Sequence, residues 1–342
     1  MNADQLRITI AGAGIFGIWQ ALTLARAGHH ITLLDRHPIP FADSASQYAG
    51  AMIAPFCEAE AAAPLVQQYG LEAARLWREQ YPGLIQKGTL VLAAPRDQNE
   101  LKRFARMTVG HETVSGNRLA DLEPDLAHRF STGLYYPDEA HMTTPEAMRN
   151  LLDKAHAAGA HSQFGSSLDD AETNPTLAPK ADMIIDCRGI AAGDMLKDLR
   201  GVRGECILIR SQDIILSRPI RLLHPRHPLY VVPWSEDRFL VGATVIESEN
   251  TSPMTVRSAL DLLGLAYALH PGFGEAEILE FSAGIRPAFP DNVPKVIVDK
   301  PCQRIHINGA FRHGFLLAPV MAAIVRDHLA GKLTEHPLMR SI

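Results

Sequence analysis

The N-terminal part of the chain alternates between short apolar runs and one longer helical pattern. Residues 6–10 and 31–34 are short runs rich in β-branched and aliphatic side chains, which is typical of buried strands. Residues 18–26, between them, are rich in Ala and Leu and predict a helix, and Gly28 stands where the glycine that ends a helix belongs. Together these segments predict a β-α-β unit within about 30 residues.

Further along the chain, the same patterns predict a mixture of helices and strands. The polar, Pro-containing residues 165–180 predict exposed turns, and Thr144 predicts a helix cap followed by Pro145 as the first helical residue. The spacing of apolar residues predicts helices over residues 72–80, 98–107, 144–158, 256–269 and 316–329. Strands are predicted over residues 88–93, 133–136, 183–185, 204–209, 214–216, 229–232, 239–245, 277–285 and 305–308.

The order of these elements predicts an α/β fold with two domains. Segments typical of β-α-β units stand near both ends of the chain, whereas the middle predicts a meandering, mainly antiparallel sheet. A dinucleotide-binding domain is therefore expected from residues 1–75, 137–203 and 287–342. The substrate-binding domain is expected to be inserted twice, as residues 76–136 and 204–286.

Three glycines at the first strand–helix junction form a ligand-binding motif. Gly12, Gly14 and Gly17 have the G-x-G-x-x-G spacing, and Asp35 ends the second strand. In such a motif the first glycine allows the tight turn, the second lets a pyrophosphate approach the backbone, and the third lets helix and strand pack closely. The Asp35 carboxylate can accept hydrogen bonds from ribose hydroxyls and would repel a 2′-phosphate, which disfavours NADP. A glycine-rich turn without a ligand is the alternative, and the motif alone does not separate NAD from FAD.

Composition and charge narrow the classes of partner. The 342 residues are 46% hydrophobic and 21% charged with a formal net charge of −5, so the overall charge favours neither nucleic acid nor an anionic membrane. The apolar residues 8–25 approach the length of a membrane span, but their clustered glycines favour a strand, a turn and a helix. The widely spaced cysteines, Cys57, Cys187, Cys206 and Cys302, include no Cys-x-x-Cys pair and predict a reduced, cytoplasmic protein.

One pair of histidines lies close enough in sequence to suggest a metal site. His224 and His227 are three residues apart, but Pro225 between them breaks the helical spacing, and no carboxylate or cysteine is nearby in sequence. We therefore expect loop histidines and no metal.

Several further motifs, in order along nearly the whole chain, resemble those of the D-amino-acid oxidase and glycine oxidase family. Residues 46–52 resemble the small-residue loop beside the flavin ring, and residues 202–205 resemble the return into the substrate domain. Residues 284–287, Gly-Ile-Arg-Pro, resemble the G-x-R-P motif of the family. Residues 309–319, Gly-Ala-Phe-Arg-His-Gly-Phe-Leu-Leu-Ala-Pro, resemble its C-terminal flavin motif. The thiamine-pathway glycine oxidases of bacteria also resemble this chain at residues 222–225 and 267–271.

The chain departs from the family pattern at the first strand pair and in the following loop. Asp35 stands where the family usually has Glu, which keeps the carboxylate that the ribose contact requires. Gln47 and Tyr48 are bulkier than the alanines common in that loop, so the flavin contacts there are expected to differ in detail.

The resemblance implies a D-amino-acid oxidase-like fold in which a Rossmann-like domain binds FAD without a covalent bond. Cys302 lies near the C-terminal motif, but its surroundings do not resemble the flavin attachment motif of the sarcosine oxidases. The residues expected to contact FAD are Gly12, Gly14, Ile15, Phe16, Gly17, Asp35, Arg36, Ser44, Ala45, Ser46, Ala49, Gly50, Ala51, Met52, Gly189, Phe311, His313, Gly314, Phe315 and Leu316.

The resemblance also implies three catalytic residues. Arg286 is expected to anchor the substrate carboxylate, because a guanidinium matches a carboxylate in two parallel hydrogen bonds; a surface arginine in a Pro-rich turn is the alternative. Tyr230 matches the tyrosine that hydrogen-bonds the same carboxylate, with a core tyrosine as the alternative. Arg312 matches a position beside substrate and flavin, and its alternative role is to hold the loop through backbone carbonyls. The helix that begins near Phe315 would point its free N–H groups at the flavin.

The function implied by the resemblance is oxidative deamination of glycine, with other small amines or D-amino acids as further substrates. A hydride would pass from the substrate to FAD, the resulting imine would hydrolyse to glyoxylate and ammonia, and O2 would be reduced to hydrogen peroxide. This chemistry would serve the synthesis of the thiamine thiazole, in a protein that is a homo-oligomer like its relatives. The alternatives are a sarcosine or D-amino-acid oxidase, a dehydrogenase that passes electrons to a quinone, and a flavin-binding protein without turnover.

Overall fold

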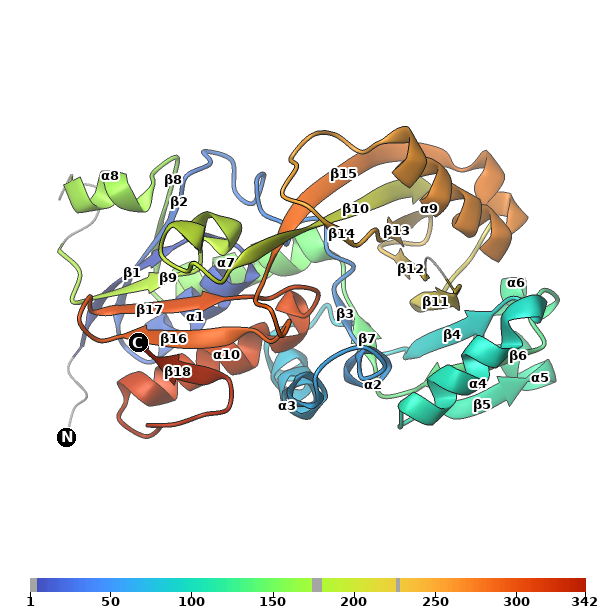
Figure 1. Ribbon diagram of the computed structural model, residues 1–342, viewed down its shortest axis with the longest axis horizontal. Coiled ribbons are helices and arrows are strands. Elements are labelled where there is room, and N and C mark those ends of the chain that lie inside the picture. The colour runs from blue at the N-terminus through green and yellow to red at the C-terminus, as the bar shows by residue number, and fades with distance from the viewer. Residues whose placement is uncertain (1–4, 174–179, 226–227) are drawn as a thin grey trace.

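Two large β-sheets lie side by side along the long axis of the molecule (Figure 1). The computed structural model describes residues 5–173, 180–225 and 228–342. One sheet has seven strands and the other has nine, and a short two-stranded pair, β3 (Met52–Ile53) with β7 (Ala140–His141), lies between them. The mixed α/β fold expected from the sequence is thus confirmed.

The seven-stranded sheet is built around the N-terminal β-α-β unit. Strand β1 pairs in parallel with β2 on one side and with β9 on the other, and β17 continues the parallel order beyond β9. Only β16 runs antiparallel to its neighbour β17. The strands, in the order in which they pair, are β18 (Met339–Ser341), β16 (Lys295–Asp299), β17 (Arg304–Asn308), β9 (Met183–Asp186), β1 (Arg7–Ala11), β2 (His30–Asp35) and β8 (His161–Phe164).

Four helices pack with this sheet and form the largest core. Helix α1 (Ile15–Arg26) contacts α7 (Thr144–Ala157) and α10 (Gly314–Leu329), and α10 also contacts α3 (Pro64–Gln80). Trp77 of α3 is fully buried and donates an indole hydrogen bond of 2.7 Å to the carbonyl of Phe315. This bond fixes α3 against the first turn of α10, which lies at the cavity described below.

The nine-stranded sheet is mainly antiparallel, and only its β11–β4 pair is parallel. Helix α9 (Val256–Leu269) packs on it with Leu262, Ala266 and Leu269 buried, and α4 (Gln98–Met107) packs beside β4 and β6. Its strands are β4 (Thr89–Ala93), β5 (Glu112–Ser115), β6 (Thr132–Tyr136), β10 (Arg200–Arg210), β11 (Ile220–Leu223), β12 (Leu229–Pro233), β13 (Arg238–Gly242), β14 (Ile246–Glu247) and β15 (Glu277–Ala288).

Strands β10 and β15 form the longest pair in the described part of the chain and extend towards the seven-stranded sheet (Figure 1). Residues 203 and 286, where predicted domain boundaries fall, lie inside these strands. The short helical elements are α2 (Pro55–Glu58), α5 (Gly116–Leu122), α6 (Pro124–Ala127), α8 (Leu168–Thr173), η1 (Pro95–Asp97), η2 (Gly189–Asp194) and η3 (Pro271–Glu275).

Three local predictions from the sequence are wrong. Residues 214–216 form no strand although Ile214 and Leu216 are buried, because the amide of Ile215 donates to the Asp125 carboxylate instead of to a neighbouring strand. Thr144 does not cap α7: its hydroxyl donates to the carbonyl of Ala49 at 2.6 Å, and Thr143 occupies the cap position. Helix α8 falls within the predicted turn region 165–180, of which residues 174–179 lie outside the described residues.

The apolar stretch at residues 8–25 forms β1, the glycine turn and α1, as predicted. Within the ranges that the structure describes, no helix combines the length and the apolar character that crossing a bilayer requires.

Candidate functional site

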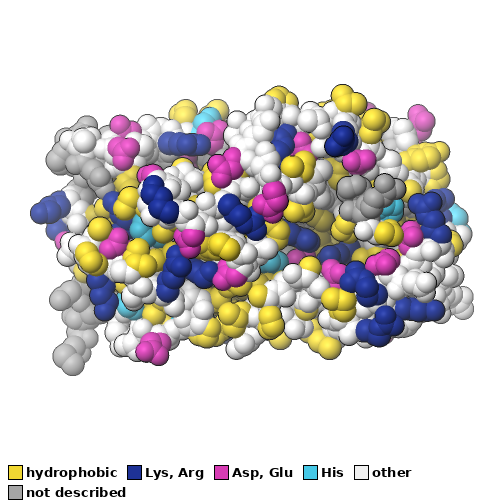
Figure 2. Space-filling model, viewed as in Figure 1, with side chains coloured by type: hydrophobic (Ala, Val, Ile, Leu, Met, Phe, Trp, Pro, Cys, Tyr) yellow, Lys and Arg dark blue, Asp and Glu magenta, His cyan; other side chains and the backbone are white. Residues whose placement is uncertain are grey.

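A cavity of about 760 Å³ opens between the two sheets, within the usual range for sites that bind small molecules and cofactors. Figure 2 shows this face of the molecule hollowed near its middle. Every site residue expected from the sequence lines the cavity except Gly17, so residues from seven separate stretches of the chain meet there. They are Gly12, Gly14, Ile15, Phe16, Asp35, Arg36, Ser44, Ala45, Ser46, Ala49, Gly50, Ala51, Met52, Gly189, Tyr230, Arg286, Phe311, Arg312, His313, Gly314, Phe315 and Leu316.

The glycine motif at the start of α1 is sterically required at two positions. Gly12 has a φ of +96°, and a Cβ there would lie 2.5 Å from the carbonyl oxygen of Cys187 in the neighbouring segment. A Cβ at Gly17 would lie 1.8 Å from the carbonyl oxygen of Gly12. Gly17 therefore allows the helix to approach the strand and need not line the cavity itself, which is the role that the motif assigns to its third glycine.

Two serine hydroxyls face the N-terminus of α1. The Ser46 hydroxyl accepts the amide N–H of Ile15 at 3.1 Å, and the Ser44 hydroxyl accepts the amide of Ser46 at 3.2 Å. A Cβ at Gly14 would fill the space in front of these hydroxyls, 3.2 Å from Ser44 Oγ. The open backbone of Gly14, the hydroxyls and the positive end of a 12-residue helix together suit the pyrophosphate of a dinucleotide.

Asp35 occupies the end of β2 and organises the turn beside it. Its Oδ2 accepts the amide of Ala13 at 2.8 Å, and its Oδ1 accepts the amide of His37 at 3.0 Å. A carboxylate has about four lone-pair positions, so Asp35 retains acceptor capacity for ribose hydroxyls while it ties β2 to the glycine turn. Asp35 could therefore hold the ribose of a dinucleotide at this end of the cavity.

The loop before α10 closes the other end of the cavity. The amide of Phe311 donates to the carbonyl of Pro287 at 2.8 Å, which ties this loop to the end of β15. His313 is the cap residue of α10 and is buried, and burial lowers the pKa of its imidazole to about 4. His313 is thus neutral at pH 7, and the N–H groups of the first turn supply the positive potential at this position.

Tyr230 and Arg286 share the cavity-facing side of the nine-stranded sheet. In the strand register Tyr230 lies opposite Gly242, Gly242 lies opposite Cys206, and Arg286 lies opposite Val202. Residues 202 and 206 are an even number apart on β10, so the three side chains of Tyr230, Cys206 and Arg286 project from the same face. The Tyr230 hydroxyl lies 3.6 Å from Cys206 Sγ.

Glycines make room for both of these polar side chains. A Cβ at Gly242 would lie 2.6 Å from the Tyr230 ring, and one at Gly50 would lie 3.0 Å from it. A Cβ at Gly204 would lie 2.0 Å from the guanidinium carbon of Arg286. The guanidinium therefore lies flat over the backbone of Gly204. Burial raises the pKa of the Tyr230 phenol, so the hydroxyl keeps its proton at neutral pH.

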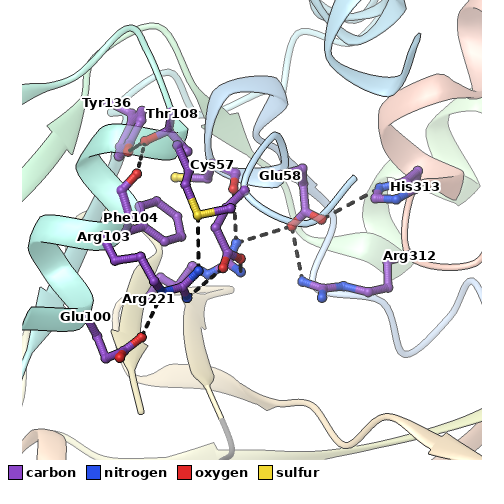
Figure 3. Close-up of polar contacts among 12 residues, drawn as sticks. Cys57, Glu58, Glu100, Arg103, Phe104, Thr108, Tyr136, Arg221, Arg312 and His313 are labelled. Atoms are coloured by element: carbon purple, nitrogen blue, oxygen red, sulfur yellow. Dashed lines mark hydrogen bonds and ion pairs between the residues drawn. The ribbon is translucent and has the colours of Figure 1, made fainter. Parts of the chain in front are cut away.

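The sequence did not point to a cluster of charged side chains beside Arg312. Glu58 at the end of α2 lies 3.3 Å from Arg312, 3.6 Å from Arg221 and 3.7 Å from Nδ1 of His313 (Figure 3). Burial alone would raise the pKa of the Glu58 carboxyl, but Arg312, Arg221 and His313 together lower it to about 2. Glu58 is therefore a carboxylate at neutral pH and offsets the charge of Arg312.

Arg221 is the second residue of this cluster that sequence reasoning missed. It is buried on β11, opposite Tyr230 in the register, and also lies 3.6 Å from Glu60 and 5.2 Å from the centre of the Phe104 ring. Neither Glu58, in a short Glu- and Ala-rich run, nor Arg221, in a strand, belongs to a recognisable motif. They can be recognised as site residues only from the contacts that these distant segments make in the folded protein.

A buried carboxyl positions the helix that carries Glu58. One oxygen of Glu139 accepts the amides of Phe56 and Cys57, at 3.0 and 2.7 Å, at the start of α2. Burial raises the pKa of Glu139 to about 7 although the hydrogen bond from the Cys57 amide lowers it. Glu139 thus holds the first turn of α2 without lining the cavity.

The structure adds one observation on metal binding. No group of three or more His, Cys, Asp or Glu side chains among the described residues is arranged to hold a metal ion. Of the histidine pair noted in the sequence, His227 lies outside the described residues.

Comparison with known proteins identifies relatives over almost the entire length of the chain. The profile of the DAO family, FAD dependent oxidoreductase, matches residues 7–328. A relative from Rhizobium etli named "Putative thiamine biosynthesis oxidoreductase ThiO" is 45% identical, with 96% of this chain and 97% of the relative covered. The glycine oxidase of Geobacillus kaustophilus is 25% identical, with 97% and 94% covered.

Solved structures share the fold. The crystal structure of glycine oxidase from Bacillus cereus superimposes with a TM-score of 0.83 at 21% identity, and covers 98% of this chain and 99% of its own. The iminodiacetate oxidase from Chelativorans gives a TM-score of 0.79 at 21% identity, with 98% and 99% covered.

Proposed function

This chain belongs to the DAO family of FAD-dependent oxidoreductases, and we propose that it oxidises glycine or a closely similar small amino acid. The observation that carries the proposal is the pair of Arg286 and Tyr230 on one cavity-facing side of a sheet, beside the N-terminus of α10. An arginine and a protonated phenol can together bind one carboxylate. The names of the relatives from Rhizobium etli and Geobacillus kaustophilus support the same substrate class.

Membership of this family confirms three expectations from the sequence. The resemblance to D-amino-acid and glycine oxidases is confirmed, the protein is an FAD-dependent enzyme, and its fold is that of the solved glycine oxidases. The absence of a covalent bond to the flavin stays a prediction. So do the domain boundaries, and we assign the seven-stranded sheet to FAD binding and the nine-stranded sheet to substrate binding.

The residues present at the cavity fit FAD. Gly14, Ser44 and Ser46 would hold the pyrophosphate, Asp35 would hold the ribose, and the residues from Phe311 to Leu316 would border the ring system. When bound, FAD supplies the acceptor for a hydride from the substrate Cα. The protein's own contribution is to bind and orient the amino acid and to shape the electrostatic field around it.

Arg286 would bind the substrate carboxylate with two parallel hydrogen bonds, and the Tyr230 hydroxyl would donate a third. Arg312, the third catalytic residue proposed from the sequence, is paired with Glu58 and so contributes little uncompensated charge. Arg221 is paired with both Glu58 and Glu60, whereas Arg286 on the sheet and the exposed Arg257 on α9 are the cavity-lining arginines that form no ion pair among the described residues. Of these two, Arg286 shares its side of the sheet with Tyr230 and is therefore our candidate for binding the substrate carboxylate.

The complete proposed reaction converts glycine, O2 and water to glyoxylate, ammonia and hydrogen peroxide. We further propose that the protein is a homo-oligomer and that its product is used for synthesis of the thiamine thiazole. The test is anaerobic flavin reduction with a panel of glycine, sarcosine, D-alanine and ethylamine, followed by measurement of peroxide in air. Glycine should reduce the flavin fastest and yield one peroxide per glyoxylate. Faster reduction by another amino acid would reassign the substrate, reduction without peroxide would indicate a dehydrogenase, and no reduction by any amine would contradict the proposal.

The carboxylate clamp has its own test. Arg286→Ala should weaken glycine binding by about 2–5 kcal/mol, because a desolvated charge pair is lost, while FAD content should not change. Arg286→Lys keeps the charge but loses the two-pronged geometry, and should also bind glycine poorly. Arg118→Ala is the matched control, since that arginine is exposed, lies outside the cavity, and contacts Glu112 and the Tyr135 ring. If Arg286→Ala slows flavin reduction by glycine and by ethylamine equally, Arg286 is not the carboxylate anchor.

A further inference from the structure

The guanidinium of Arg286 is held by a single hydrogen bond from within the described part of the protein. Its Nη1 donates to the carbonyl oxygen of Thr244 at 3.0 Å. A guanidinium has five N–H donors, so this bond fixes the orientation of the group and leaves the other donors for a ligand. The orientation of Arg286 therefore depends on where the Thr244 carbonyl lies.

Three hydrogen bonds to one residue hold Thr244 in place. The amide of Thr244 donates to the carbonyl of Glu205 at 3.2 Å, and the amide of Glu205 donates to the Thr244 hydroxyl at 2.9 Å. The same hydroxyl donates to the Glu205 carboxylate at 3.0 Å. Thr244 follows β13, outside any regular strand, so these bonds replace the strand ladder as the restraint on its backbone.

The carboxylate of Glu205 is itself fixed in the protein interior. Arg203 donates to its Oε1 from Nε at 3.0 Å and from Nη2 at 2.7 Å, and both side chains are buried. Arg203 also donates to the carbonyls of Asn250 and Pro253, ahead of α9. Burial would raise the pKa of Glu205, but the hydrogen bonds from Ser258, Arg203 and Thr244 lower it, so the group is ionised.

We propose that Glu205 and Thr244 are positioning residues that aim the Arg286 guanidinium at the substrate carboxylate. The inference rests on the proposed function of Arg286 as the carboxylate clamp. Neither residue needs to touch the substrate: the rigid Arg203–Glu205 pair fixes Thr244, and the Thr244 carbonyl holds one edge of the guanidinium. Gly204, between the two members of that pair, lets the guanidinium lie against β10. A clamp fixed in this way loses little side-chain entropy when a carboxylate binds.

The test compares Thr244→Val with Thr244→Ser in the FAD-loaded enzyme. Valine has nearly the same shape but removes the hydroxyl, whereas serine keeps it, and both leave the Arg203–Glu205 pair intact. Acetate is the probe, because it carries only the carboxylate, and its binding is followed by the change in the visible flavin spectrum. Thr244→Val removes the two hydrogen bonds that the hydroxyl makes with Glu205, and we expect the acetate Kd to rise about fivefold to tenfold, because the loss reaches acetate only through the orientation of Arg286. The KM for glycine should rise more than the limiting rate of flavin reduction falls.

Thr244→Ser should restore most of the acetate affinity, which a role in simple packing would not explain. Ser282→Ala is the matched control, because it also removes a hydroxyl from this sheet. That hydroxyl donates to the Cys206 carbonyl at 3.0 Å, but Ser282 does not line the cavity, so the substitution should leave acetate binding unchanged. If Thr244→Val and Thr244→Ser weaken acetate binding equally, the positioning role alone is overturned. The same holds if Thr244→Val leaves acetate binding unchanged while Arg286→Ala abolishes it. Unchanged acetate binding in Arg286→Ala would instead overturn the proposed clamp.

Discussion

Replacing Glu58 with Gln should destabilise the protein, because the positively charged side chains around Glu58 would lose their carboxylate partner. The substitution keeps the size of the side chain but removes the negative charge within 3.3 to 3.7 Å of Arg312, Arg221 and His313. The Glu58 side chain is only 16% exposed, so solvent screens the loss poorly. Arg221 retains Glu60 as a partner at 3.6 Å, and the variant is therefore expected to fold.

The magnitude follows from the pKa of the carboxyl. Its pKa is about 2 in the folded protein against a reference value of 4.5. At about 1.4 kcal/mol per pKa unit, this shift corresponds to at most about 3 kcal/mol of stability, of which the part due to His313 requires a protonated imidazole and is absent at pH 7. Removal of one partner from a buried ion pair costs about 3–5 kcal/mol in other proteins, which is consistent with this value.

The dependence on pH has a definite sign. Because the folded-state pKa is lowered, the contribution of Glu58 is fully present above about pH 4.5 and is lost as the pH falls through about 2. The difference in unfolding free energy between the wild type and Glu58→Gln should thus be constant from pH 8 to 5 and fall to about half near pH 3. The folded-state pKa of His313 is lowered to about 4, so above about pH 5 its imidazole is neutral in both folded proteins and its contribution cancels in the difference between them. At lower pH the protonation of His313 is coupled to that of Glu58, which lies 3.7 Å away.

Urea unfolding followed by circular dichroism, at pH 7, 5, 4 and 3, measures this difference. Glu60→Gln is the matched control, because Glu60 is as little exposed as Glu58 and shares Arg221 as a partner, but its other partner, Arg103, is 44% exposed, so this substitution should cost less than Glu58→Gln. The reasoning is refuted if Glu58→Gln costs no more than Glu60→Gln, or if its cost stays the same from pH 7 to pH 3.

Three further predictions concern the cofactor and the clamp. Gly14→Val should fold but purify without FAD, because the added side chain occupies the space before the Ser44 hydroxyl; full flavin absorbance in that variant would contradict the pyrophosphate assignment. Asp35→Ala should weaken FAD binding by about 1–3 kcal/mol in a fluorescence titration, and unchanged affinity would show that Asp35 does not hold the ribose. Gly204→Ala should displace the Arg286 guanidinium and weaken acetate binding at full FAD content, whereas Gly264→Ala, with open space around its Cα, should not.

Helices and turns whose pattern is complete within a short stretch of sequence could be predicted from that stretch alone. Helices α4 and α9 begin and end at the predicted residues, since their apolar spacing is strictly helical. The glycine turn between β1 and α1 was equally predictable, because the spacing of its glycines is a local motif and Gly17 is required by the carbonyl of Gly12 within that motif. The close contact at Gly12, in contrast, is with the carbonyl of Cys187 from a distant segment. The predicted strand 214–216 failed for the opposite reason: its apolar run is strand-like, but the Asp125 carboxylate from another segment accepts the amide of Ile215.

The composition of the site depended on contacts that no local pattern encodes. Glu58 and Arg312 are 254 positions apart, and Thr244 is 39 positions from the carboxylate that restrains it. The sequence by itself indicated the family and the dinucleotide motif and offered Arg286 and Tyr230 as candidates, because all of these lie in contiguous motifs. Only the tertiary structure decided that Arg312 is neutralised by Glu58 and that Arg286 is held by Thr244, because the charge balance of a buried site is set by which distant side chains approach within a few ångströms.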